Sequence, residues 1–269
     1  MNLLTDARHR IAAIEAAAAD ALVPTVELNL DGWRLRYGGG RARRTHSVLP
    51  ERRGRRPVEE KLRQVEAFYR ERSVAPRLQI SPVALPTGLD AHLDAAGWNR
   101  EEGAQVLWRD LSDAQSPEPE GVPKGAADRA VTIVRGEPAD EAFDAVSITT
   151  DEETAAWARA RIHALREAGR PVRPVAATAA GDPVAACLLV LEPAAQLVGL
   201  FQMATVPTAR GRGVARGLLR AALADAREAG ATGAYLQVDP RQHAALRLYQ
   251  RERFLLHHRY HYRRAPDPD

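Results

Sequence analysis

The chain has 269 residues, of which 45% are hydrophobic, and its formal net charge is only +3 although it contains 38 Lys and Arg residues. A single cysteine, Cys187, excludes an internal disulfide framework, and no apolar run is long enough to span a bilayer. These features predict a cytoplasmic protein with one large core or two smaller ones.

The first elements predicted along the chain are a helix and a hairpin. Met1 to Asp20 is Ala-rich with interspersed charges, which indicates a helix and not a secretory signal. Asp31-Gly32 separates two alternating runs, Val26 to Leu30 and Trp33 to Tyr37, and is a strong short hairpin signal.

The next elements complete a first half. Pro57 opens a helix whose apolar face carries Val58, Leu62, Val65 and Tyr69. The elements expected after it are a strand near Arg77 to Ile80, a helix from Thr87 to Ala96 and a strand from Ala104 to Leu111.

Arginines gather at Arg41 to Arg44 and at Arg52 to Arg56. They are compatible with a solvated loop, with a site for an anionic substrate or a cofactor phosphate, or with nucleic-acid contact. The low net charge and the lack of interleaved aromatic residues weigh against nucleic acid, so we expect neither a nucleic-acid nor a membrane partner.

A stretch rich in Pro, Gly, Ser and Glu, Ser112 to Gly125, predicts a linker. We therefore expect two domains, at 1–111 and 130–269, joined by residues 112–129. The second should begin with a strand at Val131 to Val134, helices at Pro138 to Ile148 and Glu152 to Ala168, and strands at Val175 to Ala180 and Val184 to Leu191.

The most informative segment follows. Leu197 to Val206 reads as a buried strand, and a glycine-rich turn then opens an amphipathic helix with Val214, Leu218, Ala222 and Ala226 on one face. The first N–H groups of a helix lack internal partners, and glycines let an anion approach them. The turn is therefore a candidate phosphate cradle.

Three further segments complete the pattern: Ala234 to Pro240, Gln242 to Tyr249, and the strand-like Leu255 to Arg263. Together with Arg210, Gly213 and Ala215, which match the motif Arg/Gln-x-x-Gly-x-Gly/Ala, they make Ala130 to Arg264 resemble the Gcn5-related N-acetyltransferase (GNAT) superfamily. The first half resembles a degenerate second copy, with Arg53 to Pro57 at the loop position. The resemblance implies an α/β fold of tandem GNAT-like domains, each a mixed, mostly antiparallel sheet flanked by helices.

The resemblance also implies acetyl-CoA as cosubstrate and no metal. Met203, Ala204 and Thr205 would bind the pantetheine arm through their main chain, and Gln242 stands where many members have a cofactor-binding asparagine. The implied pyrophosphate contacts are Arg210, Gly211, Arg212, Gly213, Val214, Ala215 and Arg216.

Tyr249 occupies the position of the family's general acid, which protonates the departing thiolate; the alternative is a tyrosine that only packs in the core. The strand offers no carboxylate as general base. Deprotonation of the amine could use an ordered water, Glu152, Glu153 or His243, and the residues do not decide among them.

The resulting hypothesis is an N-acetyltransferase acting by direct attack of a primary amine, of a small molecule or a protein, on the thioester. The alternative is a non-catalytic acetyl-CoA-binding or nucleic-acid-associated regulator on the same fold. His257, Arg259 and His261 share a strand face, for which we expect solvent contact and not a metal. The chain could be a monomer or a homodimer.

Overall fold

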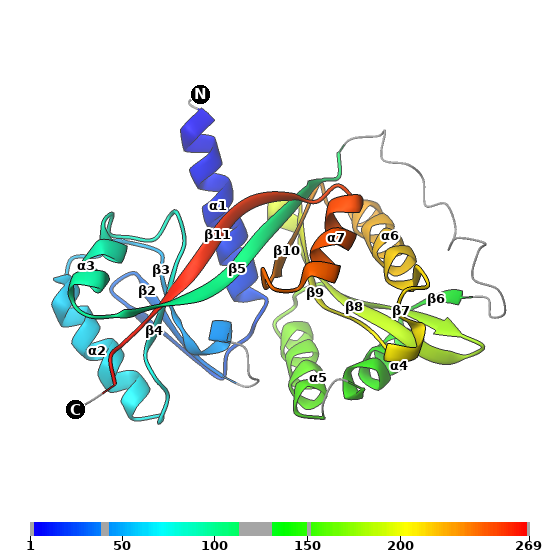
Figure 1. Cartoon of the computed structure of the whole chain (residues 1–269), viewed down its shortest axis with the longest axis horizontal. Helices are drawn as coiled ribbons and strands as arrows, with labels where there is room; N and C mark the ends of the chain where they lie inside the picture. Colours follow the sequence, from blue (N-terminus) through cyan, green and yellow to red (C-terminus); the bar gives the residue numbers. More distant parts are fainter. Residues whose placement is uncertain (1–2, 39–42, 113–130, 150–151, 268–269) are drawn as a thin grey trace. The chain divides into compact units, whose positions relative to one another are not determined.

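The structure is a computed structural model that describes residues 3–38, 43–112, 131–149 and 152–267. These residues form two compact units, Met1–Val106 with Leu256–Asp269, and Leu107–Leu255 (Figure 1). The expected linker, apart from residue 112, lies outside the described residues, so the domain boundaries at 111 and 130 stay a prediction.

The N-terminal unit has helices on a sheet with the strand order β1-β2-β3-β4-β11-β5. The last strand of the chain belongs to this unit, and β5 contributes its first part. The elements are α1 (Leu3–Asp20), β1 (Val26–Leu30), β2 (Trp33–Tyr37), the 3-10 helix η1 (Arg43–His46), β3 (Val48–Pro50), α2 (Val58–Arg70), β4 (Arg77–Ile80), α3 (Leu89–Ala95), β5 (Asn99–Asp110) and β11 (Leu255–Arg264).

The predicted hairpin is confirmed. Asp31 and Gly32 both have positive φ angles, 47° and 86°, which is the backbone of a two-residue turn that matches the twist of its strands. β1 and β2 then pair antiparallel from Leu30↔Trp33 to Val26↔Tyr37. The Trp33 and Leu35 side chains enter the core of the unit beside Val65 and Tyr69 of α2.

The C-terminal unit continues with the strand order β5-β10-β9-β8-β7-β6. β9 and β10 pair in parallel, whereas β6 with β7, β7 with β8 and β8 with β9 are antiparallel, which confirms the mixed, mostly antiparallel sheet. The elements are β6 (Val131–Arg135), α4 (Glu137–Ile148), α5 (Glu152–Glu167), β7 (Val172–Ala179), β8 (Asp182–Glu192), η2 (Pro193–Ala195), β9 (Leu197–Thr205), η3 (Pro207–Ala209), α6 (Val214–Glu228), β10 (Gly233–Val238) and α7 (His243–Arg251).

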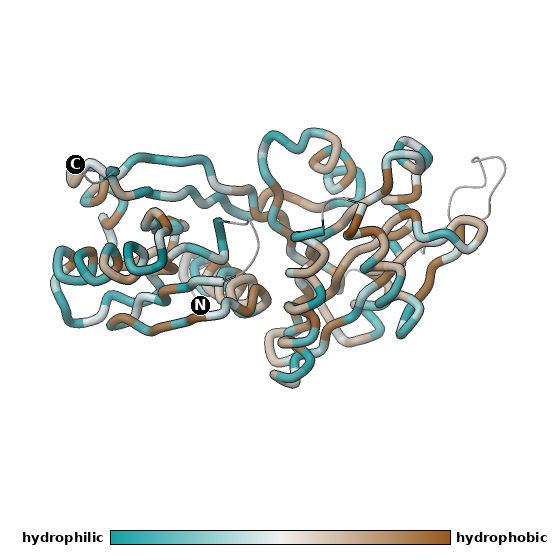
Figure 2. Tube along the Cα trace, turned by 90° about the horizontal axis from the view of Figure 1, so that it is seen from below, coloured by the Kyte–Doolittle hydropathy of each residue, from teal (hydrophilic) through white to brown (hydrophobic). Residues whose placement is uncertain are grey.

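Helices cover both faces of the strands of this unit (Figure 1). The apolar stripe of α6, including Leu218 and Ala222, packs on the face that carries Cys187 and Leu200. Because neighbouring strand residues point to opposite faces, Leu188 lies on the face covered by α4 and α5. Figure 2 shows brown and teal residues alternating along the helical turns, as expected for helices with one buried face.

The structure differs from the sequence prediction in two strands of the N-terminal unit. β3, Val48–Pro50, was not expected from the sequence, and β5 begins at Asn99 instead of Ala104. None of the described helices is both long enough and apolar enough to cross a bilayer.

Candidate functional site

The site is built where two parallel strands of the C-terminal unit separate. Pairing of β9 with β10 runs from Leu197 to Leu200, while β9 continues to Thr205 along β8. Gln202 has a φ of 49°, and the β8 register shifts opposite it, so this point is a β-bulge. In the described structure the main chain of β9 after Leu200 is therefore open on its β10 side. This is the geometry that main-chain binding of an extended ligand requires.

The phosphate cradle lies directly after this strand. Gly211 and Gly213 have positive φ angles of 75° and 79°, and Gly213 caps α6 in the left-handed conformation. Six consecutive backbone N–H groups, from Gly211 to Arg216, find no acceptor within the described part of the chain. They lie at the positive end of the α6 dipole, and a Cβ at Gly211 would meet nothing within 4 Å. The turn can accept an anionic group against its main chain.

The three arginines of the turn differ in their contacts. Arg210 folds back and donates from Nε to the Thr205 carbonyl at 3.1 Å, which ties the turn to the end of β9. Arg212 is exposed. The Nε of Arg216 donates to the Glu252 carboxylate at 2.5 Å, so this side chain is already held by an ion pair.

Glu252 is a buried acidic residue that the sequence did not reveal. Its side chain is 4% exposed, and its second oxygen accepts from Arg220 Nε at 2.9 Å. Arg109 of β5 donates to the Glu252 carbonyl at 2.7 Å. Burial would raise the pKa of Glu252, but the hydrogen bonds from Arg220 and Arg216 outweigh it and hold the pKa below its usual value. The carboxylate joins the end of α7 to α6 and β5.

Tyr249 of α7 faces β9. Its side chain is 9% exposed, and its hydroxyl lies 3.7 Å from the Met203 sulfur, a weak acceptor. The ring meets Phe254 edge-on, with centroids 5.8 Å apart. Burial, helped by the nearby Cys187, raises the pKa of Tyr249 to about 12. The phenol therefore stays protonated at neutral pH and can donate but not accept a proton.

The remaining predicted site residues lie on β9, at the start of α6 and at the start of α7. Ala204 pairs with Ala186 of β8, and Val214 places its side chain in the core while its N–H faces outward. Gln242 caps α7 and is exposed. The candidate general bases Glu152, Glu153 and His243 are all solvent-exposed, so the general base is not assigned to any of them.

A polar cluster occupies the opposite face of the sheet from α6. Arg161 of α5 is 2% exposed, and its guanidinium carbon lies 4.4 Å from the centroid of Phe201 and 5.4 Å from that of Trp157. Its Nη1 donates to Gln202 Oε1 at 3.1 Å. The Gln202 amide nitrogen is buried without a partner in the described structure. The sequence does not mark Arg161, because its contact with Gln202 joins residues 41 positions apart and forms only when α5 packs on β9.

The histidines of β11 do not form a metal cluster. His261 Nε2 lies 2.8 Å from Asp90 Oδ1, Arg259 is exposed and His257 is half-buried. Among the residues described, no group of three His, Cys, Asp or Glu is placed to hold a metal ion. Of the first arginine cluster, Arg41 lies outside the described residues, and Arg43 pairs with Glu101 at 3.4 Å.

Comparison with protein families gives one matching model over nearly the whole chain. Residues 9–263 match the family described as probable histone acetyltransferase Rv0428c, C-terminal. A comparison with curated protein sequences gives no match.

Solved structures with a similar fold cover most of the chain. A GCN5-related N-acetyltransferase from Kribbella flavida is 19% identical with a TM-score of 0.69, covering 96% of each chain. A tandem GNAT protein from the clavulanic acid biosynthesis pathway is 17% identical with a TM-score of 0.63, covering 88% of this chain and 79% of its own. A GCN5-related N-acetyltransferase from Sphaerobacter thermophilus is 19% identical with a TM-score of 0.58, covering 78% and 69%.

Proposed function

Because the chain belongs to the family described as probable histone acetyltransferase Rv0428c, C-terminal, within the GNAT superfamily, we propose that it is an acetyl-CoA-dependent N-acetyltransferase. The active site would lie in the C-terminal unit, and the acceptor would be a primary amine. The observation that carries the proposal is the run of six N–H groups from Gly211 to Arg216 that have no acceptor among the residues described, at the end of a strand whose neighbour has separated from it.

These two features fit the two ends of the cosubstrate. The turn would hold the pyrophosphate with its N–H groups, and Arg212 would add charge. The open main chain of Met203, Ala204 and Thr205 would hold the pantetheine arm as an added strand. A N–H group of β9 would donate to the oxygen that becomes negative when the amine attacks the thioester carbon.

Tyr249 would act on the leaving sulfur. A free thiol has a pKa of about 8.5, so a phenol with a pKa of about 12 does not give up its proton before charge develops on the sulfur. The hydroxyl therefore begins as a hydrogen-bond donor, and the proton moves to the thiolate as the carbon–sulfur bond breaks. The base that deprotonates the acceptor ammonium is not assigned to a residue.

The activity is tested by incubating the full chain with acetyl-CoA and a panel of amines, which should include small polyamines, amino sugars and lysine-containing histone-tail peptides. We expect release of free CoA thiol only when an acceptor is present, together with the mass gain of one acetyl group on that acceptor. Cys187 will not disturb a thiol assay, because it is fully buried and burial raises its pKa to about 12. Acetyl-CoA binding without transfer to any amine would instead support a non-catalytic ligand-binding role.

A further inference from the structure

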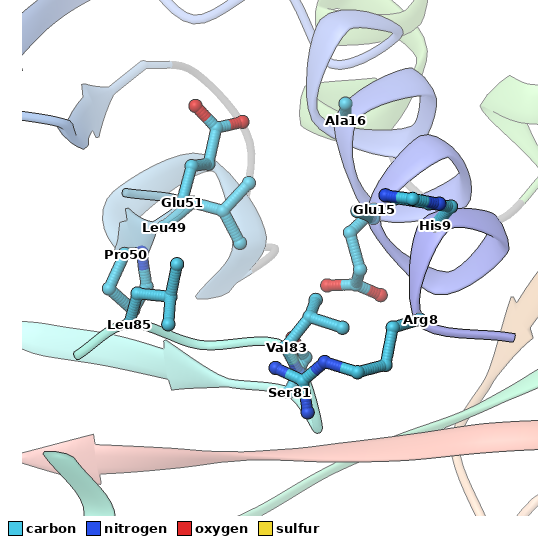
Figure 3. A pocket seen from close by; sticks show the side chains of 11 residues that line it. Arg8, His9, Glu15, Ala16, Leu49, Pro50, Glu51, Ser81, Val83 and Leu85 are labelled. Carbon is cyan, nitrogen blue, oxygen red and sulfur yellow. Dashed lines mark hydrogen bonds between the residues drawn. The ribbon is translucent and has the colours of Figure 1, made fainter. Parts of the chain in front are cut away.

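A pocket of about 420 Å³ opens in the N-terminal unit between α1 and the chain that follows β3 and β4 (Figure 3). β3 and β4 are parallel neighbours, paired at Val48↔Leu78, and Glu51 and Ser81 follow their ends. The carboxyl ends of adjacent parallel strands are where open α/β sheets bind ligands. The volume is also within the range of small-molecule sites.

The nearby start of α2 cannot take the phosphates of a nucleotide, because a carboxylate of the chain is already there. Asp31 Oδ2 accepts from the backbone N–H groups of Arg55 and Arg56 at 2.7 and 2.8 Å. Lys61 Nζ lies 3.2 Å from the same oxygen. A Cβ on Gly54 would come within 2.2 Å of it, so Asp31 fills the space above the turn. A ligand of the pocket must therefore be recognised by the pocket's own side chains.

One end of the pocket has an excess of negative charge. Glu51 lines the pocket, and its carboxylate lies 3.4 Å from the guanidinium of Arg34. Two further carboxylates lie near the same guanidinium, Asp20 at 2.5 Å and Glu27 at 3.6 Å. Burial raises the pKa of Glu51 although Arg34 and Arg36 oppose the shift. The guanidinium of Arg34 is thus shared by three carboxylates, one of which lines the pocket. An ammonium group in the pocket would give Glu51 a second ion-pair partner.

The opposite wall carries positive charge. Arg8 and His9 of α1 line the pocket and are exposed to solvent (Figure 3). Glu15 lies between Arg8 and Glu51 in this view, but its two oxygens are already taken. They accept from Gln79 Nε2 at 2.7 Å and lie 2.8 Å from His258 Nε2.

Apolar side chains separate the two charged ends. Leu49 and Val83 lie between Glu51 and Arg8 in Figure 3, and Leu85 lines the pocket beside Pro50. Ala12 and Ala16 line it from α1. A chain of methylene groups would be removed from water against these side chains, so each added group should strengthen binding by about fourfold. Between the acidic end and the basic end, the pocket thus presents apolar side chains together with the carboxylate of Glu15, whose two oxygens are already held by Gln79 and His258.

We propose that this pocket binds a small zwitterion in which an apolar chain separates an ammonium group from a carboxylate, with the ammonium at Glu51 and the carboxylate at Arg8. The ligand class is that of ω-amino acids and short amino carboxylates of similar length. The site belongs to the N-terminal unit alone and uses none of the residues assigned to acetyl-CoA. Its occupancy does not depend on the proposed acetyl transfer.

The test is calorimetric titration of the full chain with 4-aminobutyrate, 6-aminohexanoate and 8-aminooctanoate, each compared with the alkylamine and the alkanoate of equal length. We expect at least one amino acid of the series to bind about tenfold more tightly than both of its one-charge analogues, because each end adds an ion pair. Equal affinities within every matched set, or no binding by any amino acid, would overturn the proposal.

Two variants assign the ends. Glu51→Gln should reduce the affinity of the amino acid to that of the alkanoate, and Arg8→Gln should reduce it to that of the alkylamine. Arg10→Gln, on the same helix but outside the pocket lining, is the matched control and should bind as the wild type does. Arg8 is exposed, so its variant decides the question even if Glu51→Gln fails to fold. If Arg8→Gln still bound the amino acid about tenfold more tightly than both one-charge analogues, the assignment would be overturned. Acetyl-CoA binding should be unchanged in all three variants.

Discussion

The hydroxyl of Tyr249 lies 3.7 Å from the sulfur of Met203, which joins α7 to the strand that ends at the glycine-rich turn. The two residues are 46 positions apart, and their contact places the only polar atom of the Tyr249 ring beside the open part of β9. A protonated phenol next to this main chain is what a donor to a leaving sulfur requires.

Replacing Tyr249 with Phe should lower turnover by about 100-fold or more, because the donor to the leaving group is lost while the ring still packs on Phe254. Affinity for acetyl-CoA should change little. Tyr260→Phe, which removes another buried phenol in the N-terminal unit, is the control and should keep wild-type turnover. Unchanged turnover in Tyr249→Phe would leave this tyrosine with a packing role only.

The pH dependence follows from the raised pKa of Tyr249. The donor is present below its pKa of about 12 and is lost only as the pH rises through that value. Between about pH 6 and 10 the rate should therefore rise as the acceptor ammonium, with a pKa near 10.4 for a lysine side chain, loses its proton. Steady-state rates across this range should show no falling limb. A falling limb near pH 8 to 9 that disappears in Tyr249→Phe would contradict the assignment.

Glu252→Gln should destabilise the C-terminal unit by about 3 kcal/mol, because the variant leaves the buried Arg109 and its neighbours without their carboxylate. Urea unfolding measures this loss. Glu228→Gln, at an exposed position of α6, should change stability by less than about 0.5 kcal/mol. Equal stability of the two variants would mean that Glu252 does not hold α6 to α7.

The same carboxylate predicts an effect of acid. Its pKa is lowered in the folded chain, so its stabilising contribution is present above the unfolded value, near 4.3, and is lost as the pH falls through the folded value. The difference in unfolding free energy between wild type and Glu252→Gln should therefore be full at pH 7 and shrink below about pH 4. A difference that stays constant across this range would contradict the linkage.

The sequence predicted the parts of this fold that depend on neighbouring residues. The Asp31-Gly32 turn and the helix after Gly213 have local causes, namely positive φ angles and an apolar stripe. β3 was missed because a three-residue strand ending in Pro50 has no readable alternation, and its identity comes from pairing with β2 and β4. The start of β5 was predicted too late in the chain, because the first residues of this strand are polar.

In the site, the motif indicated the turn and the tyrosine, but it could not indicate their partners. Glu252 meets Arg216 across 36 positions, and Arg161 meets Gln202 across 41, so both contacts exist only after the sheet and helices have packed. The bulge at Gln202 is equally non-local, since no glycine marks it. The roles of the turn residues and of Tyr249 stay predictions.

The proposed function depends most directly on acetyl-CoA binding at the turn from Arg210 to Arg216. Calorimetric titration of the wild type with acetyl-CoA should give one site per chain. Gly213→Glu should bind at least 100-fold more weakly, a loss of about 3 kcal/mol of binding free energy, because its carboxylate would repel the pyrophosphate. Gly230→Glu is the matched control, because Gly230 also has a positive φ, 85°, but lies at the other end of α6. Retained binding in this control together with loss in Gly213→Glu is the predicted result. Equal affinity of Gly213→Glu and wild type, or no binding by the wild type, would contradict the account.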